Sequence, residues 1–136
     1  MAGHWLLKTE PSTYSFAQLE RDRRTVWDGV KNPMALKYLR QVERGDRLLV
    51  YHTGDEKAVV GIARALGAAY ADPQRSDARL AVVDIEAISR LPRPVRLAEM
   101  KASAKFKGWE LLRLPRLSVM AVPTEIWTEI ERLAQT

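Results

Sequence analysis

The sequence predicts an α+β fold in which a small mixed β-sheet curves towards a barrel and short helices flank its edges. Apolar runs of strand length recur along the 136 residues, and segments with helical spacing lie between them. Gly61 and Gly67 interrupt one apolar run, as glycines do at bulges and at corners of curved sheets. A chain of this length without repeats or long linkers is expected to form a single domain over residues 1–136.

The expected strands differ in how their faces are buried. Val83, Ile85 and Ala87 alternate with polar residues, which is typical of a strand with one solvated face. Pro92 and Pro94 are expected to end that strand, because proline cannot donate to a sheet ladder. In chain order the expected strands are residues 4–9, 47–53, 58–69, 79–91 and 117–122, with an extended piece at 25–29.

The expected helices begin at recognisable capping residues. Ser15 suits an N-cap, with Gln18 at the capping-box spacing three residues later. Asn32 suits a second N-cap because Pro33 follows at the first helical position, where a missing N–H does no harm. Thr124 is expected to cap the last helix. A turn or two of helix is expected at residues 97–103, and residues 104–114 stay unassigned.

The composition excludes several classes of protein. The absence of cysteine excludes disulfides, thiolate metal sites and a cysteine nucleophile, and two histidines are too few for a histidine-rich metal site. No catalytic or nucleotide-binding signature is present, so we expect no catalytic residues, cofactor or metal. No apolar run approaches roughly 20 residues and no signal-peptide pattern is present, so we expect a cytoplasmic protein without membrane contact.

The positive charge is concentrated in one stretch. The chain carries a net charge of +5, and residues 90–116 hold eight basic residues against two acidic ones. Such a stretch predicts a phosphate-facing surface, while a solvated basic face without a partner remains the alternative.

Residues 27–32 combine an indole, a carboxylate, a glycine, a cation and an amide. Trp27 lies on a polar connection, whereas Trp5 and Trp127 fall at positions expected in the core. An indole beside groups that read polar edges suits a flat polar ring such as a nucleobase. Trp27 is therefore a candidate stacking residue, with a lid on the core as the alternative, and Trp109 suits either packing or a second aromatic surface.

Polar side chains end two of the expected strands. Lys8, Thr9 and Glu10 follow the first strand, and Tyr51 and His52 end a later one. Side chains at strand ends near a barrel mouth commonly face a ligand, so these residues are candidate pocket walls. For His52 a hydrogen-bonded structural role is an equal alternative.

Several segments together resemble the EVE domain family of the PUA-like superfamily. They are residues 5–11, 14–16, 27–32, 51–52 and 116–119, and the resemblance spans nearly the whole chain. It implies a PUA-like fold related to the YTH domains, which hold a methylated adenine in an aromatic cage. It also implies binding of modified bases in DNA or RNA, notably 5-methylcytosine and 5-hydroxymethylcytosine.

The resemblance and the charge pattern assign roles to particular residues. Trp27 is expected to stack on the base. The remaining expected pocket residues are Asp28, Gly29, Val30, Asn32, Lys8, Thr9, Glu10, Tyr51 and His52. The expected rim or phosphate-binding residues are Lys31, Lys105, Lys107, Arg113, Arg116 and Ser118.

The leading hypothesis is a monomeric, non-catalytic reader of a modified base in DNA or RNA. It predicts that Trp27→Ala abolishes binding and leaves the fold intact. The first alternative is a general PUA-type RNA-binding module with no preference for modification, whose binding depends strongly on salt. The second is an enzyme acting on a small molecule or nucleobase, with Glu10, Asp28 and His52 as its acid–base candidates.

Overall fold

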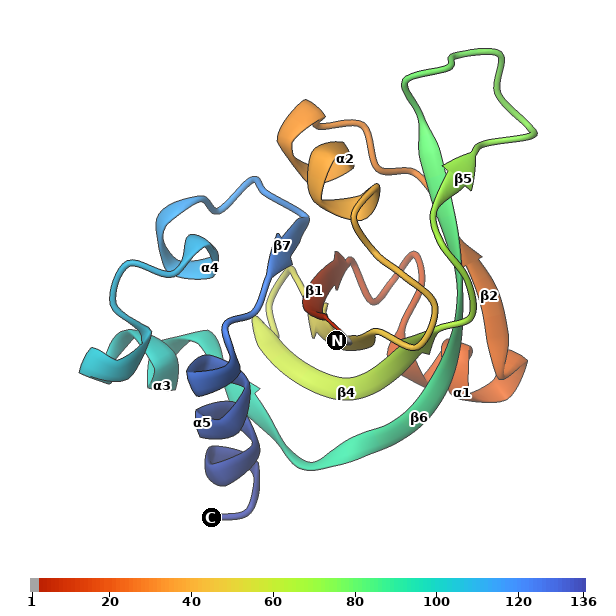
Figure 1. Cartoon of the computed structure of the whole chain (residues 1–136). Coiled ribbons are helices and arrows are strands. Elements are labelled where there is room, and N and C mark those ends of the chain that lie inside the picture. Colours follow the sequence, from red (N-terminus) through yellow and green to blue (C-terminus); the bar gives the residue numbers. More distant parts are fainter. Residues whose placement is uncertain (1–2) are drawn as a thin grey trace.

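A computed structural model describes residues 3–136 and shows a strongly curved, mixed β-sheet with short helices around it (Figure 1). The strands pair in the order β2-β6-β4-β3-β1-β7, and β5 adds to β6. In Figure 1, β4 and β6 sweep around β1 as arcs, so the sheet wraps around the core. Across the described residues β2 and β7 do not pair with each other, so the sheet curves like a barrel but stays open. The elements are β1 (His4–Thr9), α1 (Phe16–Asp22), β2 (Arg24–Trp27), α2 (Pro33–Leu39), β3 (Arg47–His52), β4 (Ala58–Ala65), β5 (Tyr70–Ala71), β6 (Ala81–Arg96), α3 (Leu97–Lys101), η1 (Ala104–Phe106), α4 (Glu110–Arg113), β7 (Val119–Ala121) and α5 (Thr124–Ala134).

The parallel pairing of β1 with β3 sets the position of the site. Lys8 lies opposite Tyr51 and Thr9 opposite His52, so the carboxyl ends of both strands meet at one edge of the sheet. The other long pairings, β3 with β4 and β4 with β6, are antiparallel. Because β1 also pairs with β7, the segment that precedes β7 lies beside the end of β1.

The long strand β6 contains both prolines that were expected to end it. Gly61 of β4 pairs with Arg90, whereas Val59 pairs with Val95, so one residue of β4 faces four residues of β6. Pro92 and Pro94 lie in this bulge, where the ladder requires no N–H from them. The expectation that the strand ends at the prolines is therefore wrong.

Two of the expected helix caps are confirmed. The Ser15 side chain accepts a hydrogen bond from the backbone N–H of Gln18. Asn32 accepts from two backbone N–H groups of α2, which begins at Pro33. The final helix begins one residue earlier than expected, because Thr124 is its first helical residue and Pro123 occupies the cap position. The unassigned segment forms the short helices η1 and α4.

Close contacts between elements shape the core. A Cβ atom on Gly61 would lie 2.4 Å from the Phe16 ring, so only glycine lets α1 pack directly on β4. Trp5 and Trp127 are buried as expected, and Trp109 is also a packing residue, because its indole donates to the carbonyl of Ala121 at 2.9 Å. Within residues 3–136, no helix has the length and apolar character needed to cross a membrane.

Candidate functional site

A pocket of about 540 Å³ opens where the end of β1 meets β2. This volume lies within the range of roughly 300–1,000 Å³ that is typical of small-molecule sites. Its walls come from the end of β1 and the turn after it, from β2 and the loop that follows, and from the segment before β7. We call it the Trp27 pocket, and its lining residues are Lys8, Thr9, Glu10, Thr13, Tyr14, Thr25, Val26, Trp27, Asp28, Gly29, Val30 and Ser118.

Trp27 is both a core residue and a pocket wall. Only 7% of its surface is exposed, and its ring meets that of Tyr14 edge to face, with centroids 6.3 Å apart and planes at 82°. The indoles of Trp5 and Trp109 donate to Asp46 and to a backbone carbonyl, respectively. Among the described residues the indole N–H of Trp27 has no acceptor, although no buried side-chain donor there is left unpaired. Its N–H therefore keeps some contact with solvent.

The end of β1 supplies a held cation and a fixed hydroxyl. The Lys8 ammonium donates to the carbonyl of Pro115 at 3.0 Å and lies 5.6 Å from the centre of the Tyr51 ring. Partial burial lowers the pKa of Lys8, because desolvation disfavours its charged form. Thr9 donates through its hydroxyl to the carbonyl of Tyr14 at 2.6 Å, which fixes the turn that carries the Tyr14 ring.

The two carboxylates of the pocket differ in their availability. Glu10 accepts hydrogen bonds from the hydroxyl of Ser12 and from its backbone N–H, the latter at 2.6 Å, and these bonds lower the pKa of Glu10. Asp28 is exposed and has no hydrogen-bond or ion-pair partner within the described part of the chain. Gly29 follows with φ of +77°, a conformation that glycine adopts without strain, and turns the chain so that Val30 is buried. Among the described residues, Asp28 is thus a carboxylate of the pocket without a partner.

Tyr51 and His52 are not among the residues that line this pocket, and a role for them in binding a base stays a prediction. Tyr51 is buried beneath Lys8, and burial raises the pKa of its phenol to about 12. The Nε2 atom of His52 accepts a hydrogen bond from the backbone N–H of Phe16 at 3.0 Å, and its Nδ1 lies 2.7 Å from Glu56. This pattern requires an Nδ1–H tautomer. His52 therefore joins α1 to β3, which is the structural alternative considered above.

The loop after the pocket leads to a separate, shallow groove. Asn32 lies there, with its side-chain oxygen occupied by the cap of α2, and so not in the Trp27 pocket as expected. Arg116 also lines this groove, while Ser118 lines the pocket. Lys31 faces a third hollow, which it shares with Arg40 and Arg79.

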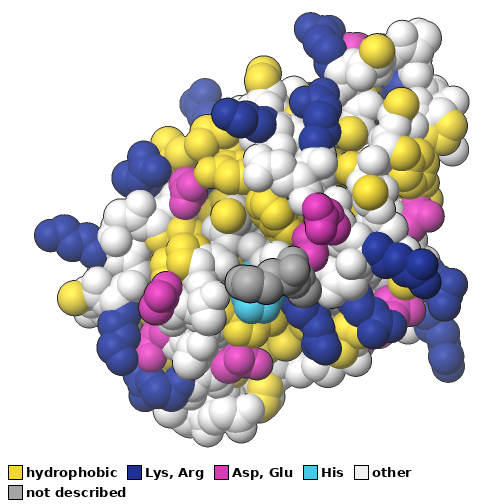
Figure 2. Space-filling model, in the orientation of Figure 1, with side chains coloured by type: hydrophobic (Ala, Val, Ile, Leu, Met, Phe, Trp, Pro, Cys, Tyr) yellow, Lys and Arg dark blue, Asp and Glu magenta, His cyan; other side chains and the backbone are white. Residues whose placement is uncertain are grey.

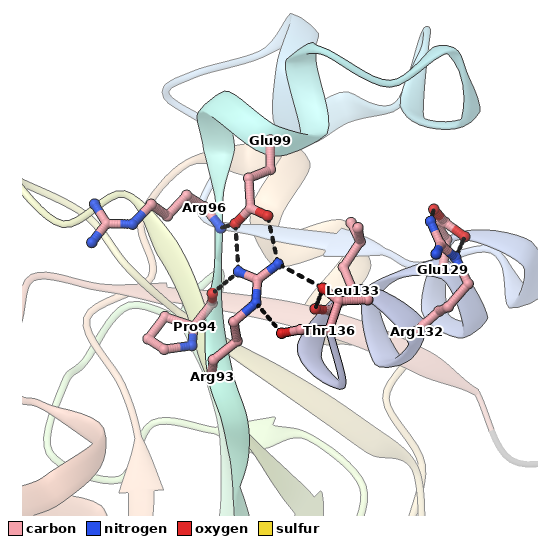
Figure 3. Close-up of polar contacts among 8 residues, drawn as sticks. All are labelled: Arg93, Pro94, Arg96, Glu99, Glu129, Arg132, Leu133 and Thr136. Carbon is pink, nitrogen blue, oxygen red and sulfur yellow. Dashed lines mark hydrogen bonds and ion pairs between the residues drawn. The ribbon is translucent and has the colours of Figure 1, made fainter.

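Several cations of the basic stretch are paired with carboxylates. On the face drawn in Figure 2, lysines and arginines lie scattered around the periphery. Several cations are paired locally: Arg90 with Glu20 and Arg93 with Glu99, both at 2.7 Å. Figure 3 shows the second pair, in which both arms of the guanidinium contact the carboxylate beside the end of α5.

Three of the expected rim cations also lie elsewhere. Lys105 pairs with Glu129 of α5 at 3.4 Å, and Arg113 donates to the carbonyl of Gly108 at 3.1 Å. Neither of them lines the Trp27 pocket, and neither does Lys107. Lys105 and Lys107 lie between α3 and α4, Arg113 is the last residue of α4, and both helices lie across the sheet from β2 (Figure 1). These three cations therefore lie outside the lining of the Trp27 pocket.

Four pocket residues were missed by the sequence argument. Thr25 lies two residues before Trp27 in β2 and so shares its face of the strand, a signal that strand periodicity offers. Val26 is 47% exposed, although an apolar residue in a strand is usually expected to be buried. Thr13 and Tyr14 reach the pocket through the tight turn after β1, and Tyr14 reads in sequence only as a residue preceding a helix cap.

The arrangement is suited to holding a ligand with polar edges. The titratable side chains that line the pocket are Lys8, Glu10, Tyr14 and Asp28, and both ring nitrogens of His52 are engaged elsewhere. Within the described residues, no cluster of three or more His, Asp or Glu side chains forms a metal site. An aromatic corner, an accessible indole N–H and a free carboxylate thus remain as recognition groups.

Comparisons with known proteins place the chain in a family. The model of the EVE domain matches residues 3–133. Human thymocyte nuclear protein 1 is 24% identical, over 92% of this chain and 71% of that protein. An NMR structure of a Rhodopseudomonas palustris protein superposes with a TM-score of 0.92 at 34% identity, covering 98% of this chain and 94% of the other. A crystal structure of human THYN1 protein in complex with DNA that contains 5-methylcytosine superposes with a TM-score of 0.91 at 24% identity, covering 99% of each chain. The expected curved, PUA-like α+β fold is confirmed, and this chain belongs to the EVE domain family.

Proposed function

We propose that this protein is a non-catalytic nucleic-acid-binding module that holds a modified base, of the 5-methylcytosine or 5-hydroxymethylcytosine type, in the Trp27 pocket. The observation that carries the proposal is the convergence of Trp27, Tyr14, Lys8 and Asp28 on one pocket of about 540 Å³. Stacking on an aromatic side chain contributes roughly 1–3 kcal/mol per base. The pocket supplies this aromatic surface together with one positively charged group, Lys8, and one negatively charged group, Asp28.

The free groups of the pocket match the edge of a cytosine. The exocyclic amine of cytosine donates hydrogen bonds, and carboxylates are its usual acceptors in proteins, so we assign this contact to Asp28. The carbonyl and ring-nitrogen acceptors of the base require donors, which the Trp27 indole and the Lys8 ammonium provide. A methyl group at the 5-position is apolar, and Val30 offers it an apolar wall.

The family and its relatives support this assignment. The chain belongs to the EVE domain family, and the human THYN1 protein of similar fold has been crystallised with DNA that contains 5-methylcytosine. A base inside a duplex has to leave the stack to enter such a pocket, and this unstacking costs a few kcal/mol. The cost is lowest when the base already lies in a single strand. We therefore propose DNA or RNA with an unstacked modified base as the partner. A monomeric state and a cytoplasmic location stay predictions from the sequence.

Binding to matched oligonucleotides tests the proposal. Single- and double-stranded DNA and RNA carrying cytosine, 5-methylcytosine or 5-hydroxymethylcytosine at one position are titrated at two salt concentrations. The expected result is tighter binding to one or both modified forms. The variant Asp28→Asn should weaken binding to the modified strand by roughly tenfold, because hydrogen bonds to charged groups contribute about 1.5–3 kcal/mol.

The variant Glu125→Gln serves as the control, since it removes one negative charge from an exposed position on α5, away from the pocket. It should bind as the unaltered protein does. Equal, salt-sensitive binding to all strands would refute modified-base recognition and favour a general nucleic-acid-binding module. Absence of binding at both salt concentrations would refute a nucleic-acid partner.

A further inference from the structure

We propose that the shallow groove beside the Trp27 pocket holds the nucleotide adjacent to the modified one on the same strand. This inference rests on the proposed function and extends it from a single base to a dinucleotide. The groove measures about 280 Å³ and is lined by Asn32, Met34, Leu114, Pro115, Arg116 and Leu117.

The groove adjoins the pocket. Leu117 lines the groove and the next residue, Ser118, lines the pocket. The Lys8 ammonium in the pocket wall donates to the carbonyl of Pro115, which lines the groove, at 3.0 Å. The two sites thus share one wall, and a strand that leaves its base in the pocket passes over this wall to reach the groove.

An exposed apolar side chain also marks the groove. Among the described residues the large hydrophobic side chains with high exposure are Val26, Met34, Tyr70 and Ile88. Val26 lines the pocket, and Met34, which is 41% exposed, lines the groove. The backbone N–H of Met34 donates to the Asn32 cap at 2.9 Å, so the position from which this side chain projects is fixed. An exposed, positioned thioether offers an apolar face for a base or a sugar.

The positive charge of Arg116 in the groove favours a nucleotide, which carries a phosphate, over an apolar peptide. Arg116 is exposed and, within the described part of the chain, makes no hydrogen bond or ion pair. By contrast, Arg90 and Arg93 of the same basic stretch are paired with glutamates. A free guanidinium beside an apolar surface matches a phosphate next to a base, and guanidinium groups bind phosphate oxygens in a bidentate manner.

The salt dependence of binding tests the phosphate contact. Affinity decreases as the salt concentration rises, and the steepness of log affinity against log salt concentration is reduced by about 1 when one phosphate contact is lost. Arg116→Gln is expected to show this reduction with the modified oligonucleotide. The matched control is Arg44→Gln, because Arg44 is exposed and precedes β3, at the end of that strand opposite the pocket. Its slope should equal that of the unaltered protein.

An abasic scan tests the base contact. Oligonucleotides with the modified base at a fixed position receive an abasic residue at the 5′ or the 3′ neighbour. For the unaltered protein, one of the two is expected to lower affinity by roughly fivefold or more. In Met34→Ala the same abasic residue should change affinity by less than about twofold, because the contact has already been removed.

The outcomes separate this inference from the proposed function. If Arg116→Gln and Met34→Ala keep the preference for the modified base and behave like the unaltered protein in both tests, the adjacent-nucleotide site is refuted and the base pocket stands. If the unaltered protein shows no preference for the modified base, both proposals are overturned.

Discussion

Trp27 is the residue at which stability and recognition can be separated most clearly. The indole forms a pocket wall, yet 93% of its surface is buried by the protein. Two substitutions probe the two roles. Trp27→Ala removes the whole ring, whereas Trp27→Phe keeps a six-membered aromatic ring and removes the indole N–H.

The burial of Trp27 sets the expected loss of stability. Replacing a buried aromatic residue with alanine costs about 3–5 kcal/mol. Since a domain is typically stable by only about 5–15 kcal/mol, this is a large share of the free energy of unfolding. The melting temperature should fall by roughly 10 °C or more. The expectation from sequence that Trp27→Ala leaves the fold intact is therefore replaced by one of substantial destabilisation.

Trp27→Phe is the informative variant for binding. It should fold with a smaller loss of stability, because most of the aromatic volume remains. Its affinity for the modified oligonucleotide should fall roughly tenfold, through the lost donor and the smaller stacking surface. Urea unfolding and oligonucleotide titration of both variants measure the two effects. An alanine variant with unchanged stability would refute the core role, and a phenylalanine variant with unchanged affinity would refute the binding role.

Two further predictions concern the frame of the fold. Gly61→Ala should lower the free energy of unfolding by about 1–3 kcal/mol, because the new methyl group would overlap the Phe16 ring; Gly67→Ala, which meets no atom within 4 Å, should show no such loss in the same urea titration. Hydrogen bonding to Arg93 lowers the pKa of Glu99 from 4.5 to about 2, so the pair stabilises the fold above pH 4.5 and this contribution is lost as the pH falls towards 2. Melting temperatures across that range should therefore fall less steeply in Arg93→Gln than in the unaltered protein, and equal slopes would contradict the assignment.

Local features of the fold were predictable because they depend on neighbours in sequence. Ser15 and Asn32 cap helices through hydrogen bonds to backbone groups two or three residues away, and both caps are confirmed. The alternation of Val83 and Ile85 with polar residues likewise specifies a strand with unequal faces. The end of that strand was not predictable, because whether Pro92 removes a ladder hydrogen bond depends on what β4 places opposite it.

The candidate site was predictable in part for a related reason. The sequence indicated an aromatic-polar loop at Trp27 and a polar strand end at Lys8 and Thr9, and the structure brings these together at one pocket. These segments are far apart in the chain. They come together because β1 pairs with β3 and β7, and because β2 pairs with β6. Tyr14 joined them only because the turn after β1 folds back over the pocket.

The sequence by itself determined the family, the class of fold and two helix caps, and it indicated candidate residues for binding a base, because these features reside in short motifs and local periodicity. The tertiary structure alone decided which of those residues share a pocket, that both ring nitrogens of His52 are hydrogen-bonded within the protein, and that three cations of the basic stretch are paired with glutamates. Burial and charge pairing are long-range properties. They depend on which surfaces the folded sheet places in contact, and no window of sequence contains that information.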